Sequence, residues 1–161
     1  QTVRYFKEFK GVKRRLELIA NVSDIKIYDD FAHHPTAVKK TIEALRNTSE
    51  IVGTAKLNRL IVVFEPRSNS LKLGHGKHQL SESFSGADIV HVYDGAVNWD
   101  VKSALNSLGQ KVYVESNVQH ILQRLSSQVC KGDTVVFMSN GDFQGILQAF
   151  VEILALKKCQ R

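Results

Sequence analysis

Two aspartates, two histidines and a proline lie close together in the string DDFAHHPT at residues 29–36. Carboxylates and imidazoles can exchange protons, bind a nucleotide or ligate a metal ion. A simpler explanation is a helix start, in which Pro35 occupies the first turn and an acid favours the positive helix N-terminus. That explanation accounts for one acid and the proline, but not for both acids and both histidines. We therefore interpret the string as a functional corner.

A metal site is disfavoured by the spacing within this string. Adjacent residues of an extended segment point to opposite sides of the chain. Asp29 and Asp30, or His33 and His34, are therefore not expected to face one ion together. We assign no metal ligand to the sequence.

A second polar string, EPRSNSLKLGHGKHQL at residues 65–80, begins where an apolar run ends. Pro66 stops that run, and Arg67, Ser68 and Asn69 follow with donors suited to a carboxylate or a phosphate. Arg67 is favoured because a guanidinium can bind such groups with two parallel hydrogen bonds. The alternative is a solvated basic loop, and this alternative is favoured for three side chains further along: Lys72, His75 and His78.

A third string, MSNGDFQGI at residues 138–146, joins another apolar run to a helical pattern. Backbone N–H groups at a helix start can bind anions, although a Ser–Asn–Gly turn with a cap is also an ordinary helix start. The sequence has neither a G-x-G-x-x-G string nor a G-x-x-x-x-G-K-[ST] loop. It therefore lacks a complete set of groups for holding nucleotide phosphates.

These strings are expected at one edge of a sheet, where the carboxyl ends of parallel strands bind ligands. Short β-branched runs alternate with helical patterns, which indicates right-handed βαβ units. Alternation between residues 16 and 20 predicts an antiparallel strand before the first parallel one. The fold class is therefore α/β, with a Rossmann-like, doubly wound, mostly parallel sheet and an antiparallel strand at its N-terminal side. The expected strands are 25–29, 60–65, 88–93, 111–115 and 133–139, and the expected helices are 35–49, 74–85, 100–108, 117–128 and 142–158.

The composition favours one globular domain with a sizeable core, since 43% of the 161 residues are hydrophobic and 24% are charged. No apolar run is long enough to span a membrane. The net charge of +6 suggests nucleic acid, but aromatic residues are sparse and most basic residues are scattered, so small anionic ligands are favoured. The two cysteines lack zinc spacing and indicate a reduced, cytoplasmic protein. We expect no nucleic-acid or membrane partner.

Taken together, GVKRRLE at residues 11–17 and the strings at 29–36 and 65–80 resemble the C-terminal domain of the Mur ligases, which form amide bonds in peptidoglycan synthesis at the expense of ATP. The resemblance covers essentially the whole chain. DDFAHHPT is most similar to the branch that uses UDP-N-acetylmuramate. EPRSNS and the SNG turn are similar to those members that attach the L-alanyl-γ-D-glutamyl-meso-diaminopimelate tripeptide in peptidoglycan recycling. The L-alanine-adding members are the alternative, but they carry a Q-P-H-R-[YF]-[ST]-R string that this sequence lacks.

The resemblance implies a three-domain enzyme of which this chain is the third domain. Residues 1–14 would be an interdomain linker, and residues 15–161 the acceptor-binding domain. The UDP-sugar domain and the central ATPase domain would lie outside this chain, and the central domain would bind most of the ATP and Mg²⁺. ATP would activate the muramate carboxylate, and the tripeptide amine would then attack it. Because the ATPase domain would lie outside this chain, the isolated domain would be inactive. A non-catalytic module that binds a nucleotide or an anion is the alternative from another class.

The resemblance also implies roles for individual residues. Arg14 and Arg15 would reach the nucleotide phosphates, and Asp30 would lie near the ribose. His33 and His34 would line the seam between nucleotide and acceptor, and they are the candidates for a catalytic role. Five residues would bind the tripeptide: Arg67, Ser68, Asn69, Asn140 and Gly141.

Asp142 departs from the resemblance, because a small residue is expected after Gly141 in the tripeptide-adding members. An acid at this position would repel a carboxylate of the acceptor. It would be compatible with the acceptor only if it points away or pairs with the acceptor's amine. The role of the third string is therefore less defined than that of the other two.

Overall fold

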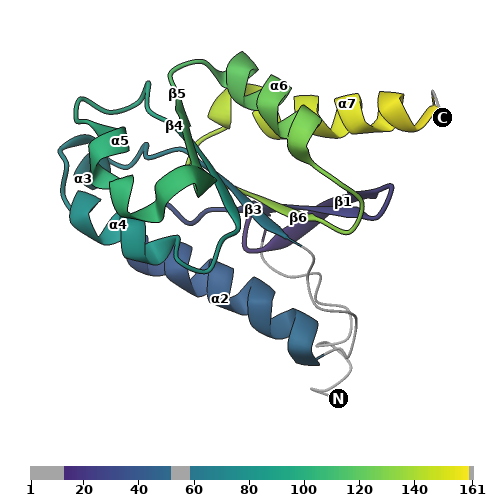
Figure 1. Cartoon of the computed structure of the whole chain (residues 1–161), viewed down its shortest axis with the longest axis horizontal. Coiled ribbons are helices and arrows are strands. Elements are labelled where there is room, and N and C mark those ends of the chain that lie inside the picture. The colour runs from purple at the N-terminus through teal and green to yellow at the C-terminus, as the bar shows by residue number, and fades with distance from the viewer. Residues whose placement is uncertain (1–12, 52–58, 160–161) are drawn as a thin grey trace.

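The computed structural model of this chain describes residues 13–51 and 59–159 (Figure 1). The expected linker, residues 1–14, lies outside the described residues except for Lys13 and Arg14. The described part contains a six-stranded sheet in the spatial order β1-β2-β6-β3-β4-β5. β1 and β2 are antiparallel, and the other neighbouring pairs are parallel. The predicted fold class is confirmed. The strands are β1 (Glu17–Val22), β2 (Ile25–Asp30), β3 (Leu60–Phe64), β4 (Ile89–Tyr93), β5 (Val112–Glu115) and β6 (Thr134–Met138).

Helices cover both faces of the sheet (Figure 1). One face carries α2 (Pro35–Ile51), α3 (Asn69–Lys72), α4 (Lys77–Ser83) and α5 (Val101–Ala104), and the other carries α6 (Val118–Gln128) and α7 (Ile146–Cys159). Two 3₁₀ segments, η1 (Asn106–Lys111) and η2 (Phe143–Gly145), precede β5 and α7. In the described residues, no helix combines the length and apolar character needed to cross a bilayer.

The continuous apolar runs of β3 and β6 are explained by this two-sided cover. Every residue of both strands is buried. Val62 and Phe64 face the core under α2 and α4, whereas Ile61 and Val63 face the core under α6 and α7. A central strand therefore needs apolar residues at every position, because alternate side chains enter two different cores.

The helix boundaries differ from the sequence prediction where the backbone turns left-handed. The expected helix over 74–85 is found as the shorter α4, and the short helix α3 lies before it. The two helices are separated because Gly74 and Gly76 between them have φ of 80° and 78°. α7 begins at Ile146, four residues after the expected start at residue 142, because Phe143, Gln144 and Gly145 have φ of 47°, 52° and 71°. Such conformations interrupt a right-handed helix.

The strand register brings three strand ends level. Asp30 at the end of β2 pairs with Met138 at the end of β6, and Met138 pairs with Phe64 at the end of β3. Because these strands are parallel, the segments that follow them leave the sheet at one edge, here named the carboxyl edge. The opposite edge is named the amino edge. Since β1 is antiparallel to β2, the residues just before β1 also lie at the carboxyl edge.

Candidate functional site

Asp30 organises the first loop of the carboxyl edge. Its buried carboxylate accepts hydrogen bonds from the backbone N–H groups of Leu16 (2.7 Å) and Ala32 (2.8 Å) and from the Thr41 hydroxyl (3.1 Å). These bonds tie the start of β1 and the first turns of α2 to the end of β2. Both carboxylate oxygens are used within the chain, so the geometry favours a positioning role over direct contact with a ribose.

The two histidines of the first loop have different environments. His33 Nδ1 lies 2.8 Å from the carbonyl oxygen of Phe31. Because a carbonyl only accepts, Nδ1 is the donor in this contact, and Nε2 is the ring nitrogen that the contact does not use. His34 is exposed, and its carbonyl accepts the N–H of Val38 in α2. His33 is therefore the histidine whose ring is fixed at the edge.

Arg14 and Arg15 differ in their hydrogen bonds, although both guanidiniums lie near the Phe31 ring, 5.4 and 5.8 Å from its centre. The Arg14 guanidinium donates through Nε to Asp29 (3.0 Å) and through Nη2 to the carbonyls of Ser139 and Gly141 (both 2.7 Å). Arg15 is exposed and makes no hydrogen bond with the other described residues. Of the two arginines, Arg15 is the one available for a nucleotide phosphate.

Arg67 and Asp142 form an ion pair between the second and third loops. Arg67 Nη1 lies 3.3 Å from Asp142 Oδ1, and the side chains are 46% and 82% exposed, so the pair is weak on its own. The Arg67 side chain lies over Gly141, where an added Cβ atom would clash with the guanidinium. The departure noted at Asp142 is thereby explained in part, since the acid lies beside the arginine expected to bind carboxylates.

Ser68 and Asn69 begin α3. The Ser68 Oγ accepts the N–H of Leu71 (3.3 Å) as the N-cap of this helix, and it lies 3.5 Å from the His33 carbonyl. The buried hydroxyl thus serves the helix cap. Asn69 is exposed, and it is the side chain of this pair that can face a ligand.

The third loop lies between the other two, because β6 lies between β2 and β3. It carries Asn140, whose Oδ1 is buried without a hydrogen-bond partner among the described residues. An unpaired buried amide oxygen is costly unless a ligand or a water supplies a donor. The structure therefore brings together Arg67, Gly141 and Asp142 with Asn140 beside them.

Two buried polar residues of this edge were missed by the sequence analysis. Glu65 directly follows β3 and is 3% exposed, and its Oε2 accepts a 2.5 Å hydrogen bond from the Ser139 hydroxyl. Ser139 Oγ in turn accepts the N–H of Gly141 (2.9 Å). The available signal was an acid placed between an apolar run and Pro66, which is a strand-end position.

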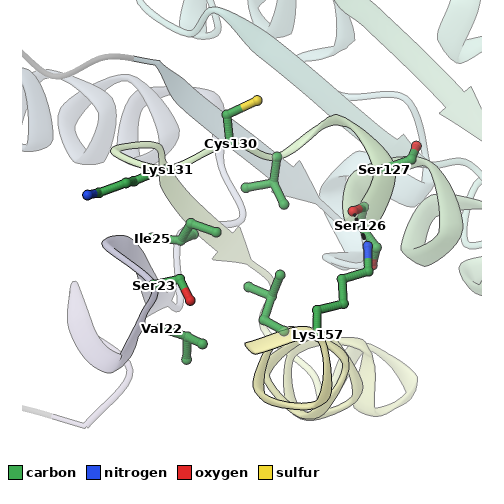
Figure 2. Close-up of a pocket in the computed structure, with 10 residues that line it drawn as sticks. Val22, Ser23, Ile25, Ser126, Ser127, Cys130, Lys131 and Lys157 are labelled. Carbon is green, nitrogen blue, oxygen red and sulfur yellow. Dashed lines mark hydrogen bonds between the residues drawn. The ribbon is translucent and has the colours of Figure 1, made fainter. Parts of the chain in front are cut away.

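Two hollows of the described surface differ in character. One, of about 320 Å³, lies at the carboxyl edge, and Arg14, Asp29 and Asp142 contribute to its wall. The other, of about 450 Å³, lies at the amino edge among Val22, Leu154 and neighbouring residues. Figure 2 shows that Lys131 and Cys130 point away from this second hollow, and the Lys157 ammonium is used in a 2.7 Å hydrogen bond to the Ser126 carbonyl. The carboxyl edge is therefore the candidate site.

Among the described residues, no group of three or more His, Cys, Asp and Glu side chains could hold a metal ion. We assign no Mg²⁺ ligand to these residues. The groups that the carboxyl edge presents instead are the cation of Arg15, the free Nε2 of His33 and the oppositely charged pair of Arg67 and Asp142. Such a set suits anionic and zwitterionic ligands.

Comparison with known proteins supplies the family. Residues 14–141 match the family described as Mur ligase, glutamate ligase domain. The UDP-N-acetylmuramate–L-alanyl-γ-D-glutamyl-meso-2,6-diaminoheptandioate ligase of Escherichia coli (strain K12) is 38% identical over 150 residues, which are 92% of this chain and 32% of that protein. The chain therefore spans about a third of the length of this relative.

Two solved structures have the same fold. A crystallised domain of a UDP-N-acetylmuramate:L-alanyl-γ-D-glutamyl-diaminopimelate ligase from Haemophilus ducreyi 35000HP is 37% identical, with a TM-score of 0.71 over 87% of this chain and 99% of that one. A murein peptide ligase of Psychrobacter arcticus 273-4 is 35% identical, with a TM-score of 0.74 over 91% of this chain and 31% of that one.

Proposed function

This chain belongs to the Mur ligase family, and from that premise we propose that it is the acceptor-binding domain of an ATP-dependent ligase that joins L-alanyl-γ-D-glutamyl-meso-diaminopimelate to UDP-N-acetylmuramate. The match to a third of a longer relative supports a parent protein with separate UDP-sugar and ATPase domains. Residues 1–14 would then link this domain to the central one. The enzyme would act in the cytoplasm, in peptidoglycan recycling.

The observation that carries the choice of acceptor is the exposed ion pair of Arg67 and Asp142. The distal end of meso-diaminopimelate carries a carboxylate and an ammonium on one carbon atom. Arg67 can bind the carboxylate with its fork of donors, and Asp142 can accept from the ammonium. The unpartnered Oδ1 of Asn140 can accept from a further N–H of the peptide. Binding of this zwitterionic end would therefore replace the weak pair of Arg67 and Asp142 with several bonds between the protein and the ligand.

The nucleotide side of the domain is formed by the first loop and the residues before β1. ATP would supply the phosphoryl group that activates the muramate carboxylate. Arg15, which is exposed, would bind a phosphate, and the Nε2 of His33 would face the seam between nucleotide and acceptor. Asp30 would hold these residues in place through its bonds to Leu16 and Ala32. The central domain would hold Mg²⁺.

The contribution of this domain to the reaction would be orientation. When the domain closes, it would bring the acceptor amine to the activated carboxylate and remove water from the seam. Holding two reactants in a productive geometry replaces a bimolecular encounter by a step within one complex. Closure also strengthens the bonds of Arg67 and Arg15 to their ligands, because the surrounding water is displaced.

The test of this function is an assay of the full-length protein with UDP-N-acetylmuramate, ATP and either the tripeptide or L-alanine. We expect release of ADP and phosphate and formation of UDP-N-acetylmuramoyl-tripeptide, identified by mass spectrometry, with kcat/KM for the tripeptide at least about a hundredfold above that for L-alanine. The 161-residue chain alone should give no turnover. Turnover with L-alanine alone would identify the L-alanine-adding ligase, and none with either acceptor would favour the non-catalytic module.

Arg67 provides a test of the acceptor site. Arg67→Ala should lower kcat/KM for the tripeptide by a factor that corresponds to a loss of about 2–4 kcal/mol of transition-state stabilisation, if the carboxylate is desolvated on closure. Arg67→Lys keeps the charge without the fork and should give an intermediate loss. Lys72→Ala is the matched control, because Lys72 is an exposed cation five residues further along. An unchanged tripeptide KM in Arg67→Ala would remove Arg67 from the acceptor site.

A further inference from the structure

The turn formed by Ser139, Asn140 and Gly141, here named the acceptor turn, is held by side chains on two sides. On one side, Arg14 Nη2 donates to the carbonyl oxygens of both Ser139 and Gly141 at 2.7 Å. On the other side, the Ser139 hydroxyl donates to the buried carboxylate of Glu65 at 2.5 Å. Neither Arg14 nor Glu65 belongs to the loop that it holds, so the conformation of the turn depends on two distant segments of the chain.

Arg14 is itself fixed in an inward orientation. Its Nε is bound to Asp29 at 3.0 Å, and its guanidinium lies 5.4 Å from the centre of the Phe31 ring. Its carbonyl accepts the N–H of Phe31 at 2.8 Å. Its φ of 56° is in the left-handed region, which is unfavourable for arginine and is maintained only where surrounding contacts require it. Arg14 therefore cannot turn toward a nucleotide without releasing the turn.

Glu65 holds the turn through a directional chain of hydrogen bonds. The Ser139 hydroxyl gives its proton to Glu65, and its oxygen is then free to accept the N–H of Gly141 at 2.9 Å. Glu65 is 3% exposed, and its own N–H is bound to the Met138 carbonyl at 3.0 Å, so its place at the end of β3 is fixed. The neutral amide of glutamine could accept the same hydroxyl proton.

The acceptor turn carries the groups that face the proposed acceptor. It includes Asn140 with its unpartnered Oδ1, it places Gly141 under the Arg67 guanidinium, and it leads directly into Asp142. A shift of the turn would move all of these groups relative to each other. It should leave Arg15 in place, because Arg15 makes no hydrogen bond with the other described residues and its guanidinium lies over the Phe31 ring, which is outside the turn.

We infer that Arg14 and Glu65 are positioning residues for the acceptor, and that the adjacent arginines divide their work: Arg15 binds the nucleotide, and Arg14 holds the acceptor turn. This inference rests on the proposed ligase function. It differs from the expectation that both arginines reach the nucleotide phosphates. It also assigns a role to Glu65 that does not depend on its charge, since only the acceptor oxygen for the Ser139 hydroxyl is needed.

The first experiment measures KM for ATP and for the tripeptide in the full-length ligase. Arg14→Ala should raise the tripeptide KM by about tenfold or more and leave the ATP KM within about twofold. Arg15→Ala should show the reverse pattern. Arg59→Ala is the matched control, because Arg59 makes a similar inward tie, to Asp133 and the Gln128 carbonyl, at the amino edge. It should change neither KM.

The second experiment compares Glu65→Gln with Glu65→Ala. If Glu65 only positions the turn, the glutamine variant should retain most of the tripeptide affinity, and the alanine variant should resemble Arg14→Ala. Equal loss of kcat in both variants, with KM unchanged, would overturn the inference, because it would show that the charge acts in the chemical step. An Arg14→Ala effect on the ATP KM instead of the tripeptide KM would overturn it equally.

Hydrogen exchange measured by mass spectrometry separates this inference from the proposed function. In the full-length protein, Arg14→Ala and Glu65→Ala should speed exchange more in peptides that cover the acceptor turn than in the rest of the domain, whereas any faster exchange in Arg59→Ala should not be concentrated at the turn. If that result is obtained with a wild-type protein that ligates no tripeptide, the role of Arg14 and Glu65 in holding the acceptor turn is retained and the proposed function is rejected. Unchanged exchange at the turn in both variants would reject that role of Arg14 and Glu65, whatever the activity.

Discussion

The two edges of the sheet are each tied by an arginine whose side chain is about one third exposed, but the ties leave different surroundings. At the amino edge, Arg59 donates through Nε and Nη2 to Asp133 (3.0 and 2.6 Å), which is 1% exposed. This carboxylate raises the pKa of the Arg59 guanidinium above its ordinary value. At the carboxyl edge, Arg14 binds Asp29, which is 18% exposed, and two backbone carbonyls.

The difference lies in the exposure of the acidic partner of each arginine and in the segments that the arginine holds. Asp133 is fully used at the amino edge, since it also accepts the N–H of Cys130 at 2.7 Å, and beside the hollow nearby the Lys157 ammonium donates to the Ser126 carbonyl (Figure 2). At the carboxyl edge, Arg14 instead holds two carbonyls of the acceptor turn, which carries Asn140. Buried side-chain atoms without partners among the described residues occur at both edges: Asn140 Oδ1 at the carboxyl edge, and Ser126 Oγ, Gln128 Oε1 and Thr134 Oγ1 at the amino edge. One kind of tie therefore serves stability at one edge and ligand geometry at the other.

The largest expected effect is the loss of stability in Arg59→Ala. Removal of the guanidinium leaves the Asp133 carboxylate buried and unpaired, which typically costs about 3–5 kcal/mol. Arg14→Ala should cost only about 1 kcal/mol, because Asp29 can be hydrated. Urea unfolding of both variants measures the two values. Equal losses would show that the two edges do not differ in the way described.

A second prediction concerns His91, which lies in β4 between the two edges. It is fully buried, and neither ring nitrogen has a hydrogen-bond partner among the described residues. Burial, with a smaller contribution from the Arg124 charge, lowers its pKa from 6.5 to about 4, and the nearby Gln128 and Glu115 side chains oppose this shift only weakly. Between these two pH values, the unfolded chain binds the proton and the folded chain does not. The stability contributed by neutral His91 is therefore present above pH 6.5 and is lost as the pH falls toward 4.

This acid loss should amount to about 3 kcal/mol. His91→Phe, which keeps a ring against Tyr113, removes the titration and should flatten this part of the profile. The measurement is the difference between the unfolding free energies of wild type and variant across this pH range. Taking the difference cancels the carboxylates, which titrate equally in both proteins. Parallel profiles would mean that His91 is protonated in the folded state or reached by water.

Asp30→Ala tests whether the first loop is positioned or contacts the ligand directly. The change leaves the N–H groups of Leu16 and Ala32 and the Thr41 hydroxyl without their acceptor, and we expect a stability loss of about 2 kcal/mol. Because Asp30 would hold Arg15 and His33 in place, a positioning role predicts that the ATP KM of the folded variant rises, and that the KM of an ATP analogue without ribose hydroxyls rises by about the same factor. A rise for ATP with no rise for the analogue would instead support contact with the ribose.

Gly141→Ala should have the smallest effect on stability. The backbone of Gly141 has no positive φ, and the added Cβ would meet the flexible Arg67 side chain, so we expect a change within about 0.5 kcal/mol. Displacement of Arg67 should nevertheless raise the tripeptide KM. Thermal unfolding and steady-state kinetics on one preparation would separate the two effects. Gly145→Ala is not a matched control, because Gly145 has φ of 71°.

Much of the fold could be predicted from the sequence because its signals are local. The apolar runs that became β3 and β6 end in Pro66 and in the Ser–Asn–Gly turn, which mark strand ends wherever the strands lie. The start of α2 at Pro35 is likewise set by the proline itself. The shortened helices after β3 were not predicted, since their ends depend on left-handed glycines that a helical pattern does not reveal.

The sequence by itself determined which residues stand at strand ends, and therefore that Asp30, Arg67 and Asn140 would share one edge of a parallel sheet. The tertiary structure alone decided that β6 lies between β2 and β3, so that the acceptor turn is the central loop of the three. It also decided that Arg14 faces inward while Arg15 remains exposed. Strand order and side-chain direction depend on contacts between distant segments, and a string of adjacent basic residues carries no record of those contacts.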